Sequence, residues 1–519
     1  MVTVTAPSES RLDPRRWWAL GALVASMLVL GFDMTILNVA LPTIAEDLGA
    51  STGQQQWMAD AYIVVFAALM LPAGLLGDRF GRRRMLIGGL GVFLAASLVG
   101  ALAGDVTWVI VARALMGVGG AFVMPLAMSV LPSLFPRSEQ TKAIGMISAA
   151  SALGMPLGPI IGGWLLNHFW WGSVFVLNVP MVAIGITACL FLLPESRDPA
   201  APKVDTVSTV LTALGLGSLI YAIIEGPGRG WSDAVVVGAF AAAVALLTAL
   251  ILRERRGTRP MLDLSLLAHR GFLSNTLAAT LGMFVLSGVL FLLPQYLQAV
   301  LGIDSLGTGV RMVPLMGGML LAARLAQPLV VRFGARSVVC AALAVLAFAA
   351  FLGARTTVDS GYGFTALWLS IGGVGIAFAM IPAMGGAMAA LDKDQAGRGT
   401  GLLSTVRQTG SALGVALLGA LVAGAYTDRL STAGLPGPAA EVARDSVTGA
   451  HVVAGRLGDE ALAASANTAY LHGMDLALIV IGVVALAAAL LSAALMPGRV
   501  RPDENTSSTA EVAPISADA

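Results

Sequence analysis

Charge is the scarcest ingredient of this sequence. Of its 519 residues only 12% are charged, whereas 57% are hydrophobic, and the mean hydropathy is +0.83. Soluble globular proteins carry about 25% charged residues, so the composition excludes a water-soluble protein. The net charge of +1 provides no basic field for nucleic acid, and nucleic acid is excluded as a partner.

Cysteine and histidine are also rare. Cys189 and Cys340 lie in apolar runs and are interpreted as packing residues rather than a disulfide or a metal pair. The four histidines are isolated, and no Gly-x4-Gly-Lys-Ser/Thr loop is present to bind a nucleotide. The sequence therefore predicts no metal, no cofactor and no enzyme activity, and uphill transport would have to draw on an ion gradient.

Long apolar runs dominate the chain. A bilayer core about 30 Å thick needs roughly 20 apolar residues per helix, and only helices satisfy the backbone of such segments. Fourteen runs qualify, at 17–39, 57–77, 85–104, 107–130, 141–166, 173–193, 207–226, 232–252, 271–296, 308–331, 336–354, 361–381, 397–424 and 472–496. We therefore predict an all-α integral membrane protein of fourteen transmembrane helices.

The distribution of Lys and Arg predicts the orientation. With a cytoplasmic N-terminus, inside segments hold 19 of the 31 basic residues and outside segments hold five. We expect a multi-pass protein of the plasma (inner) membrane with both termini in the cytoplasm. Its external segment 426–471 is consistent with a small helical hairpin or with a plain surface loop.

Short repeats suggest that the chain is a duplication. Arg79-Phe80-Gly81 recurs as Arg332-Phe333-Gly334, and Ser-Ala-Leu-Gly at 151–154 recurs at 411–414, with offsets of 253 and 260 residues. Two similar offsets favour two six-helix halves, an arrangement typical of secondary transporters. The expected organisation is a cytoplasmic tail 1–16, a bundle 17–193, two inserted helices 207–252, a second bundle 271–496 with an external loop 425–471, and a disordered cytoplasmic tail 497–519.

The turn after the second span carries a specific motif. Gly77 and Gly81 permit a tight turn, and Asp78 can pair with a neighbouring arginine, although a purely topogenic basic loop would look similar. The pattern Gly-x3-Asp-x2-Gly-Arg-Arg closely resembles the signature loop of the major facilitator superfamily. The resemblance implies two six-helix bundles around a central cavity and a gating function for this turn, formed by Gly77, Asp78, Arg79, Gly81, Arg82 and Arg83.

The fifth span has glycines spaced by four residues, which form a smooth face for close helix packing. Ordinary small-residue packing would explain them equally well. The pattern Gly-x3-Gly-Pro-x2-Gly-Gly nevertheless resembles the antiporter signature of drug-exporting major facilitators, which uptake members generally lack. Its residues here are Gly154, Gly158, Pro159, Gly162 and Gly163.

Three of the charged residues within spans are candidates for proton coupling. A membrane carboxylate costs about 2.5–3.5 kcal/mol, so Asp33 needs a partner or a function, unless water reaches it near the outer interface. The stretches around Asp33, around Asp60 (Trp57–Tyr62) and at Trp171–Pro180 resemble the fourteen-span drug:proton antiporter branch. The resemblance implies proton coupling by Asp33, Asp60 and Arg113; snorkelling of Arg113 to an interface is the alternative.

Several polar and flexible side chains are candidates for a substrate cavity: Asn38, Tyr62, Met116, Met155, Glu225, Arg407 and Gln408. Family members usually have Gln where Met116 stands, and some that handle divalent cations have an acidic residue where this chain has Gly317 and Gly318, which disfavours dicationic substrates. Glu225 and Asp475 lie at the ends of predicted spans and are interpreted as interfacial rather than catalytic.

The resemblance extends from about residue 15 to residue 496 and implies alternating-access export of small lipophilic, cationic drugs or dyes in exchange for protons, by a monomer embedded in the lipid bilayer. Two other functions stay open. One is dedicated export of a single endogenous antibiotic, and the other is a membrane sensor that transports nothing. Charged residues within the spans favour transport.

Overall fold

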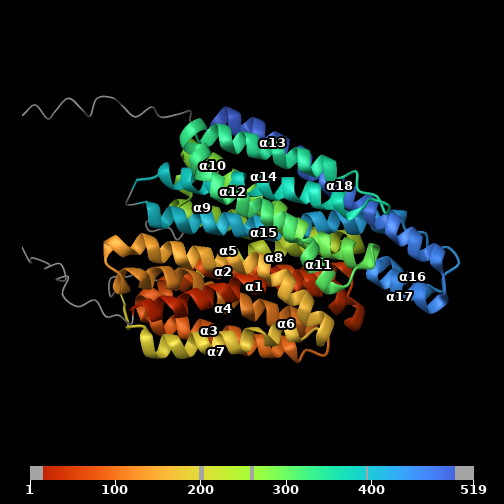
Figure 1. The fold of residues 1–519 in the computed structure, drawn as a ribbon, viewed down its shortest axis with the longest axis horizontal. Helices are drawn as coiled ribbons and strands as arrows, with labels where there is room; N and C mark the ends of the chain where they lie inside the picture. Colours follow the sequence, from red (N-terminus) through yellow and green to blue (C-terminus); the bar gives the residue numbers. More distant parts are fainter. Residues whose placement is uncertain (1–15, 198–203, 258–261, 393–394, 497–519) are drawn as a thin grey trace, which may run out of the picture.

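The computed structural model describes residues 16–197, 204–257, 262–392 and 395–496. Every regular element in these ranges is helical, and the long helices run side by side (Figure 1). The described chain begins and ends at the same end of the bundle, which we call the terminal end. The opposite end, which carries α16 and α17, is called the hairpin end. The tails predicted at 1–16 and 497–519 lie almost wholly outside the described residues.

The first half of the molecule consists of the helices that precede residue 193. In chain order they are α1 (Arg16–Leu48), α2 (Thr52–Phe80), α3 (Arg82–Ala101), α4 (Val106–Leu134), α5 (Arg137–His168), α6 (Ser173–Val176) and α7 (Asn178–Leu192). α2 begins with a capping box, in which the Ser51 side chain accepts from the Gln54 backbone and the Gln54 side chain accepts from Ser51. Such caps satisfy the free N–H groups at a helix start.

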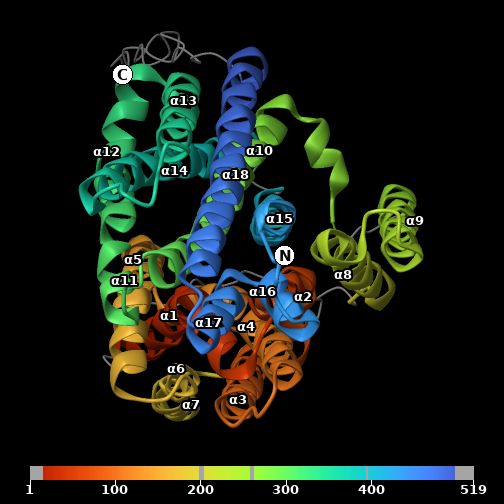
Figure 2. The same cartoon turned by 90° about the vertical axis from the view of Figure 1, so that its right-hand side faces the viewer.

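Two further helices, α8 (Thr206–Arg229) and α9 (Ala234–Arg256), follow the first half. Figure 2 shows them on one side of the molecule, where α8 packs against both α2 and α15. At the terminal end, Arg253 pairs with Asp205, which caps α8. Partial burial raises the pKa of Asp205, but hydrogen bonds from Ser208 and Arg253 outweigh this effect and hold the pKa below its ordinary value.

The second half begins with a short 3₁₀ turn, η1 (Leu264–Ala268). It continues with α10 (Arg270–Gln295), the π-helical turn η2 (Tyr296–Val300), α11 (Ser305–Arg311), α12 (Val313–Phe333), α13 (Ala335–Gly353), α14 (Tyr362–Ala389), α15 (Ala396–Arg429), α16 (Gly437–Asp445), α17 (Val447–Leu457) and α18 (Glu460–Leu495). Thirteen helices in the described ranges are long and apolar enough to cross a membrane. α5 contains the remaining expected span, 141–166, and packs along α1. The predicted all-α membrane fold is confirmed.

The two repeated Arg-Phe-Gly motifs form matching turns. Gly81 and Gly334 have φ angles of 115° and 84°, which side chains rarely allow. Each donates its N–H to the carbonyl four residues earlier, Gly77 or Val330, at 2.9 and 2.8 Å. The same short connection therefore joins α2 to α3 and α12 to α13.

The segment predicted to be external folds as a helical hairpin, so of the two structures that the sequence left open the hairpin is the one observed. α16 and α17 pack on each other, and α17 also contacts α1, α18 and η2. The Tyr426 hydroxyl on α15 donates to the carbonyls of Ala443 and Ser446 at 2.8 and 3.2 Å, which fixes the hairpin to the second half. α18 begins at Glu460, well before the predicted span start at 472.

The described hydrogen bonds between the two halves gather toward the hairpin end. Asn167 on α5 donates to Asp304 at 2.5 Å, and Gln298 donates to the Val39 carbonyl at 2.8 Å. Gln56 on α2 donates to two carbonyls of α15 at 2.9 and 3.1 Å. Thr52 donates to the Asp445 carbonyl of the hairpin at 2.9 Å. The halves are thus held together at the hairpin end.

Candidate functional site

A buried ion pair lies inside the first half. The Arg113 Nη1 of α4 donates to the Asp33 Oδ2 of α1 at 2.7 Å, and the two side chains are 3% and 2% exposed. Buried opposite charges stabilise each other only when the geometry is good and the remaining polar atoms are satisfied. The predicted coupling residues Asp33 and Arg113 are therefore direct partners.

Neighbouring groups complete this pair. Asn178, at the start of α7, donates to the Asp33 Oδ1 at 3.2 Å and to the Ser97 hydroxyl at 3.4 Å. The Arg113 Nε donates to the Met58 carbonyl at 3.2 Å, and the guanidinium lies 4.5 Å from the centroid of the Tyr62 ring. Asn178 belongs to the stretch typical of the family branch, but nothing in the sequence singles out its side chain.

Asp60 lies on another face of α2. It is fully buried, and neither carboxylate oxygen has a hydrogen-bond partner. Helical spacing puts it on the same side as Gln56, which bonds to α15, and Val64, which packs with apolar residues of α8 and α15. The structure therefore separates the two acids: Asp33 is paired near the centre, and Asp60 is unpaired at the junction of α2, α8 and α15.

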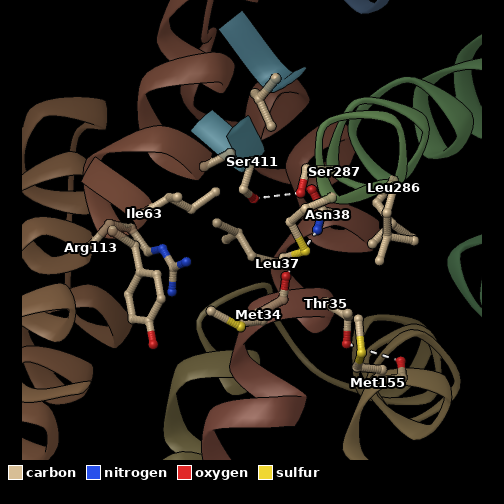
Figure 3. Close-up of a pocket in the computed structure, with 15 residues that line it drawn as sticks. Met34, Thr35, Leu37, Asn38, Ile63, Arg113, Met155, Leu286, Ser287 and Ser411 are labelled. Atoms are coloured by element: carbon tan, nitrogen blue, oxygen red, sulfur yellow. Dashed lines mark hydrogen bonds between the residues drawn. The ribbon is translucent and has the colours of Figure 1, made fainter. Parts of the chain in front are cut away.

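A cavity lies between the halves, beside the Asp33–Arg113 pair (Figure 3). Its volume of about 40 Å³ holds a few water molecules, at about 10–15 Å³ each. Drug-sized pockets occupy about 300–1,000 Å³, so this cavity is too small for a drug-sized ligand. The wall is mainly apolar and formed by Met34, Thr35, Leu37, Asn38, Ala59, Tyr62, Ile63, Arg113, Met155, Met283, Leu286, Ser287, Leu290, Ser411 and Val415.

Three of the seven cavity candidates from the sequence, Asn38, Tyr62 and Met155, line this space. The other four do not. Met116 is fully buried one turn from Arg113. Glu225 forms an ion pair with Arg229 at 2.7 Å, and Arg407 donates to the Met384 sulfur at 3.0 Å. Gln408 is buried in α15.

The glycine-rich face of α5 packs against α1. A Cβ atom at Gly154 would lie 2.9 Å from the Gly31 Cα, and a Cβ atom at Gly162 would lie 2.5 Å from the Ile36 Cγ1. A Cβ atom at Gly158 would collide with the Thr35 hydroxyl. These contacts leave no room for side chains at the three glycines.

The hairpin end of the same helix meets the other half. A Cβ atom at Gly163 would collide with the Ser305 carbonyl of α11, and one at Gly309 would collide with the Pro159 carbonyl. α5 therefore makes backbone-close contacts with α1 in its own half and with α11 in the opposite half. A shift of the halves must change the second set of contacts.

The predicted gating turn is anchored within the first half. Arg82 donates to Asp78 at 2.8 Å, and Gly77 packs against the Leu126 side chain of α4. The Arg83 backbone N–H donates to Glu195 at 3.2 Å, and its side chain donates to the Leu190 carbonyl. The Arg79 guanidinium lies 5.6 Å from the Phe80 ring. Glu195 escaped the sequence analysis because it follows an ordinary apolar span.

Residues 23–415 match the Major Facilitator Superfamily. The match spans well over half of the sequence. The chain belongs to this superfamily. It is therefore a membrane transporter with small-molecule substrates, and the predicted family is confirmed.

Similar curated proteins are drug exporters. A tetracenomycin C resistance and export protein of Streptomyces glaucescens is 34% identical over 507 residues, which cover 95% of this chain and 94% of that protein. The multidrug efflux pump LfrA of Mycolicibacterium smegmatis is 33% identical over 497 residues, which cover 93% of this chain and 97% of that protein. Superfamily members of similar sequence thus include exporters named for one antibiotic and exporters named for many drugs.

Solved structures support the fold. A bacterial homologue of the human lysosomal transporter Spinster, in an inward-facing and unoccupied conformation, aligns with a TM-score of 0.67 and 19% identity. The alignment covers 93% of this chain and 98% of that chain. At this identity the likeness concerns the fold alone.

Asp78→Asn is expected to slow transport turnover roughly fivefold, because a partly exposed ion pair contributes about 1 kcal/mol or less. Substrate affinity should stay unchanged, since the turn is far from the central cavity. Glu225→Gln is the matched control, because it removes an i,i+4 ion pair of similar length at the other end of the bundle. Lost affinity with unchanged turnover would refute the gating assignment.

Proposed function

We propose that this transporter exports small lipophilic, cationic compounds in exchange for protons, as a monomer in the plasma membrane. Its terminal end would face the cytoplasm, in agreement with the basic residues of the loops at that end. The apolar, methionine-containing cavity wall suits ligands of varied shape, because methionine repacks easily. The names of the drug-exporting relatives support the same substrate class.

The Asp33–Arg113 pair at the edge of the cavity is the observation that carries the proposal. With Asp33 ionised, the pair is neutral and the cavity tolerates a cation. A proton on Asp33 would leave Arg113 as an uncompensated positive charge. At about 6 Å and an effective dielectric constant of about 20, two like charges repel by about 3 kcal/mol, which corresponds to roughly a hundredfold loss of cation affinity.

Antiport requires that binding of a proton weakens binding of the substrate, and the repulsion from Arg113 has this effect. A proton that arrives from the hairpin side expels the cation toward that side. When the halves close at the hairpin end, the proton leaves toward the terminal side and the pair forms again. In this proposed second state the hairpin end would be closed and Asp33 would be ionised, ready for another cation.

In this scheme the protonation state of Asp60 acts as a latch, which means that it controls whether the hairpin end is closed. An ionised carboxylate without a partner is costly at this depth, so the protonated form fits the closed junction of α2, α8 and α15. Loss of this proton would destabilise the junction and favour opening at the hairpin end. Asp60 and Asp33 thus have different tasks, the first conformational and the second in direct exchange with substrate.

Asp60→Asn should hold the protein in the state closed at the hairpin end, because asparagine mimics the protonated acid. Spin labels on the hairpin-end loops of the two halves should report a single short distance at every pH from about 5 to about 9. In the wild type the distance between the spin labels should instead increase as the pH rises. A variant whose distances follow pH as in the wild type would show that Asp60 is not the latch.

The function itself is tested with purified protein in vesicles. An imposed pH gradient should drive uptake or release of ethidium, a monovalent cationic dye, and proton movement should accompany it. Cells that carry the gene should tolerate a panel of cationic dyes and antibiotics. Protection against no compound, with no flux in vesicles, would favour the sensor.

Dedicated export of one antibiotic is the second candidate. The relative named for tetracenomycin C aligns over nearly its whole length, which favours a single antibiotic as substrate. The same panel separates the two functions, because a dedicated exporter would protect against one compound.

A further inference from the structure

Four buried polar atoms in the second half, away from the Asp33–Arg113 pair, have no hydrogen-bond partner. They belong to three different segments: η2, α14 and α18. The atoms are the Tyr296 hydroxyl, the Thr365 hydroxyl, the Trp368 indole N–H and the Asp475 Oδ1. The first three side chains are 0%, 1% and 4% exposed. Buried polar groups are seldom left unpaired, so this cluster calls for a ligand.

Electrostatic and packing contacts hold the cluster together. The Tyr296 hydroxyl lies within interaction range of both the Thr365 hydroxyl and the Asp475 carboxylate. Trp368 is one turn beyond Thr365 on α14, and its ring packs beside Gly353 together with Leu478, one turn beyond Asp475. Tyr296 and Asp475 are therefore neighbours, and Trp368 lies close to the α18 residue one turn beyond Asp475.

The backbone at Tyr296 is unusual. Residues 296–300 form a π-helical turn at the end of α10. π-Turns inside helices often mark functional sites. Thr365 likewise lies within the first turn of α14, so the cluster is close to the hairpin end of both helices. The sequence predicts an interfacial position for Asp475, and it offers no sign of the buried polar groups on η2 and α14.

The donor and acceptor types define the ligand. Two hydroxyls and an indole N–H can donate to a carboxylate or to a water molecule bound to it, and all three have no other partner. A sodium or calcium ion needs several oxygen ligands, and the indole N–H cannot serve as one. The two hydroxyls can also accept a hydrogen bond, so a protonated Asp475, bridged to them by water, satisfies them as well as the ionised form does.

Other charged groups do not compensate Asp475. On the elements packed against α18, the titratable group that faces Asp475 is Tyr296. Tyr426 donates to the hairpin carbonyls, and His451 of α17 bonds to Asn467 at 2.7 Å. Among the described residues, none of the other titratable groups on these elements or near Asp475 in sequence bonds to its Oδ1: Arg336, Cys340, Arg355, Tyr362, Arg407, Asp428, Arg429, Arg456, Tyr470 and His472.

We propose that Asp475, with Tyr296, Thr365 and Trp368, is a proton-binding site of the second half that takes up one proton from the hairpin side in each transport cycle. The proton passes from water at the hairpin end to an oxygen of Asp475, and it returns to water on the terminal side when the halves shift. This inference rests on the proposed proton-coupled export. It adds one proton to the stoichiometry.

Infrared difference spectra of the purified protein between pH 5 and pH 9 test the site without any substrate. Asp475→Asn should remove one protonated-carboxyl band, and Tyr296→Phe should shift its titration midpoint while leaving the band in place. Asp428→Asn, at an exposed acid near the same end, is the control and should leave the band unchanged. A spectrum of Asp475→Asn identical to that of the wild type would overturn the proposal.

A stoichiometry measurement tests the transport step. The pH gradient and membrane potential that just stop ethidium flux in vesicles give the number of protons per cation. Asp475→Asn should lower this number by one, whereas Asp428→Asn should not. An unchanged ratio would overturn the second proton site but leave proton-coupled export intact. Absence of ethidium flux in the wild type would instead contradict the proposed function, and the infrared result would still decide the site.

Discussion

Asp33→Asn is expected to abolish proton-driven export while the protein still reaches the membrane. The change leaves Arg113 as a buried cation without its anionic partner. Breaking a buried ion pair costs about 3–5 kcal/mol, which corresponds to roughly a hundredfold to several-thousandfold in an equilibrium. Dye flux driven by an imposed pH gradient in vesicles measures the loss directly.

A double variant distinguishes coupling from stability. Asp33→Asn combined with Arg113→Gln removes both charges and allows the two amides to hydrogen-bond. The midpoint temperature of thermal unfolding should be lower in Asp33→Asn than in the wild type. In the purified double variant it should rise again toward the wild-type value, since no unpaired charge remains. Export should stay absent. Recovery of pH-driven flux together with stability would mean that the pair only stabilises the fold.

Arg113→Lys should also reduce export, because the rigid guanidinium group of the arginine makes three separate contacts. It donates to Asp33 and to the Met58 carbonyl, and it lies over the Tyr62 ring. A lysine provides a single ammonium that can lose its proton when desolvated. Flux by this variant should therefore fall as external pH rises from about 6 to about 8. A flat profile at the wild-type rate would favour snorkelling.

Gly158→Leu is the second change with a large expected effect, and it should eliminate export. A Cβ atom at this position would lie 3.0 Å from the Phe32 carbonyl oxygen and 3.3 Å from the Ile36 nitrogen, and would collide with Thr35. The backbone of α1 cannot yield without moving Asp33, which follows Phe32. The larger side chain should therefore separate α1 from α5 and disturb the ion pair as well.

Gly145→Leu provides the matched control on the same helix. A Cβ atom at Gly145 would meet nothing within 4 Å, so a side chain there enters open space. This variant should export dye at the wild-type rate, and its vesicles should hold a pH gradient. Equal activity of Gly145→Leu and Gly158→Leu would mean that the glycine face of α5 has no special function.

Much of the fold could be predicted because it depends on local properties. Apolar runs long enough to span a bilayer are visible in sequence regardless of how they pack. The external segment was ambiguous because its two short helices are stabilised by contacts from elsewhere, such as the Tyr426 hydroxyl on α15. The extension of α18 back to Glu460 depends in the same way on its packing against α17.

The charged residues of the site were individually visible because charge is rare within membrane spans. Their pairing was not, since Asp33 and Arg113 lie 80 residues apart and meet only in the folded bundle. Asp60 and Tyr62 are two residues apart, so the helical period alone places them on opposite sides of α2. Asn178 and Glu195 were missed because each acts through a contact with a distant segment.

The position of α8 and α9 makes the two lipid-facing sides of the molecule unequal. α8 covers the line where α2 meets α15, whereas none of the described helices covers the opposite line, between α5 and α11–α12 (Figure 2). A lipophilic compound that diffuses within the bilayer therefore encounters a sealed flank on one side of the protein. Lateral access to the central cavity is confined to the other flank, so bulky lipids or detergents bound along α5 and α12 should compete with drugs, whereas the same molecules along α9 should not.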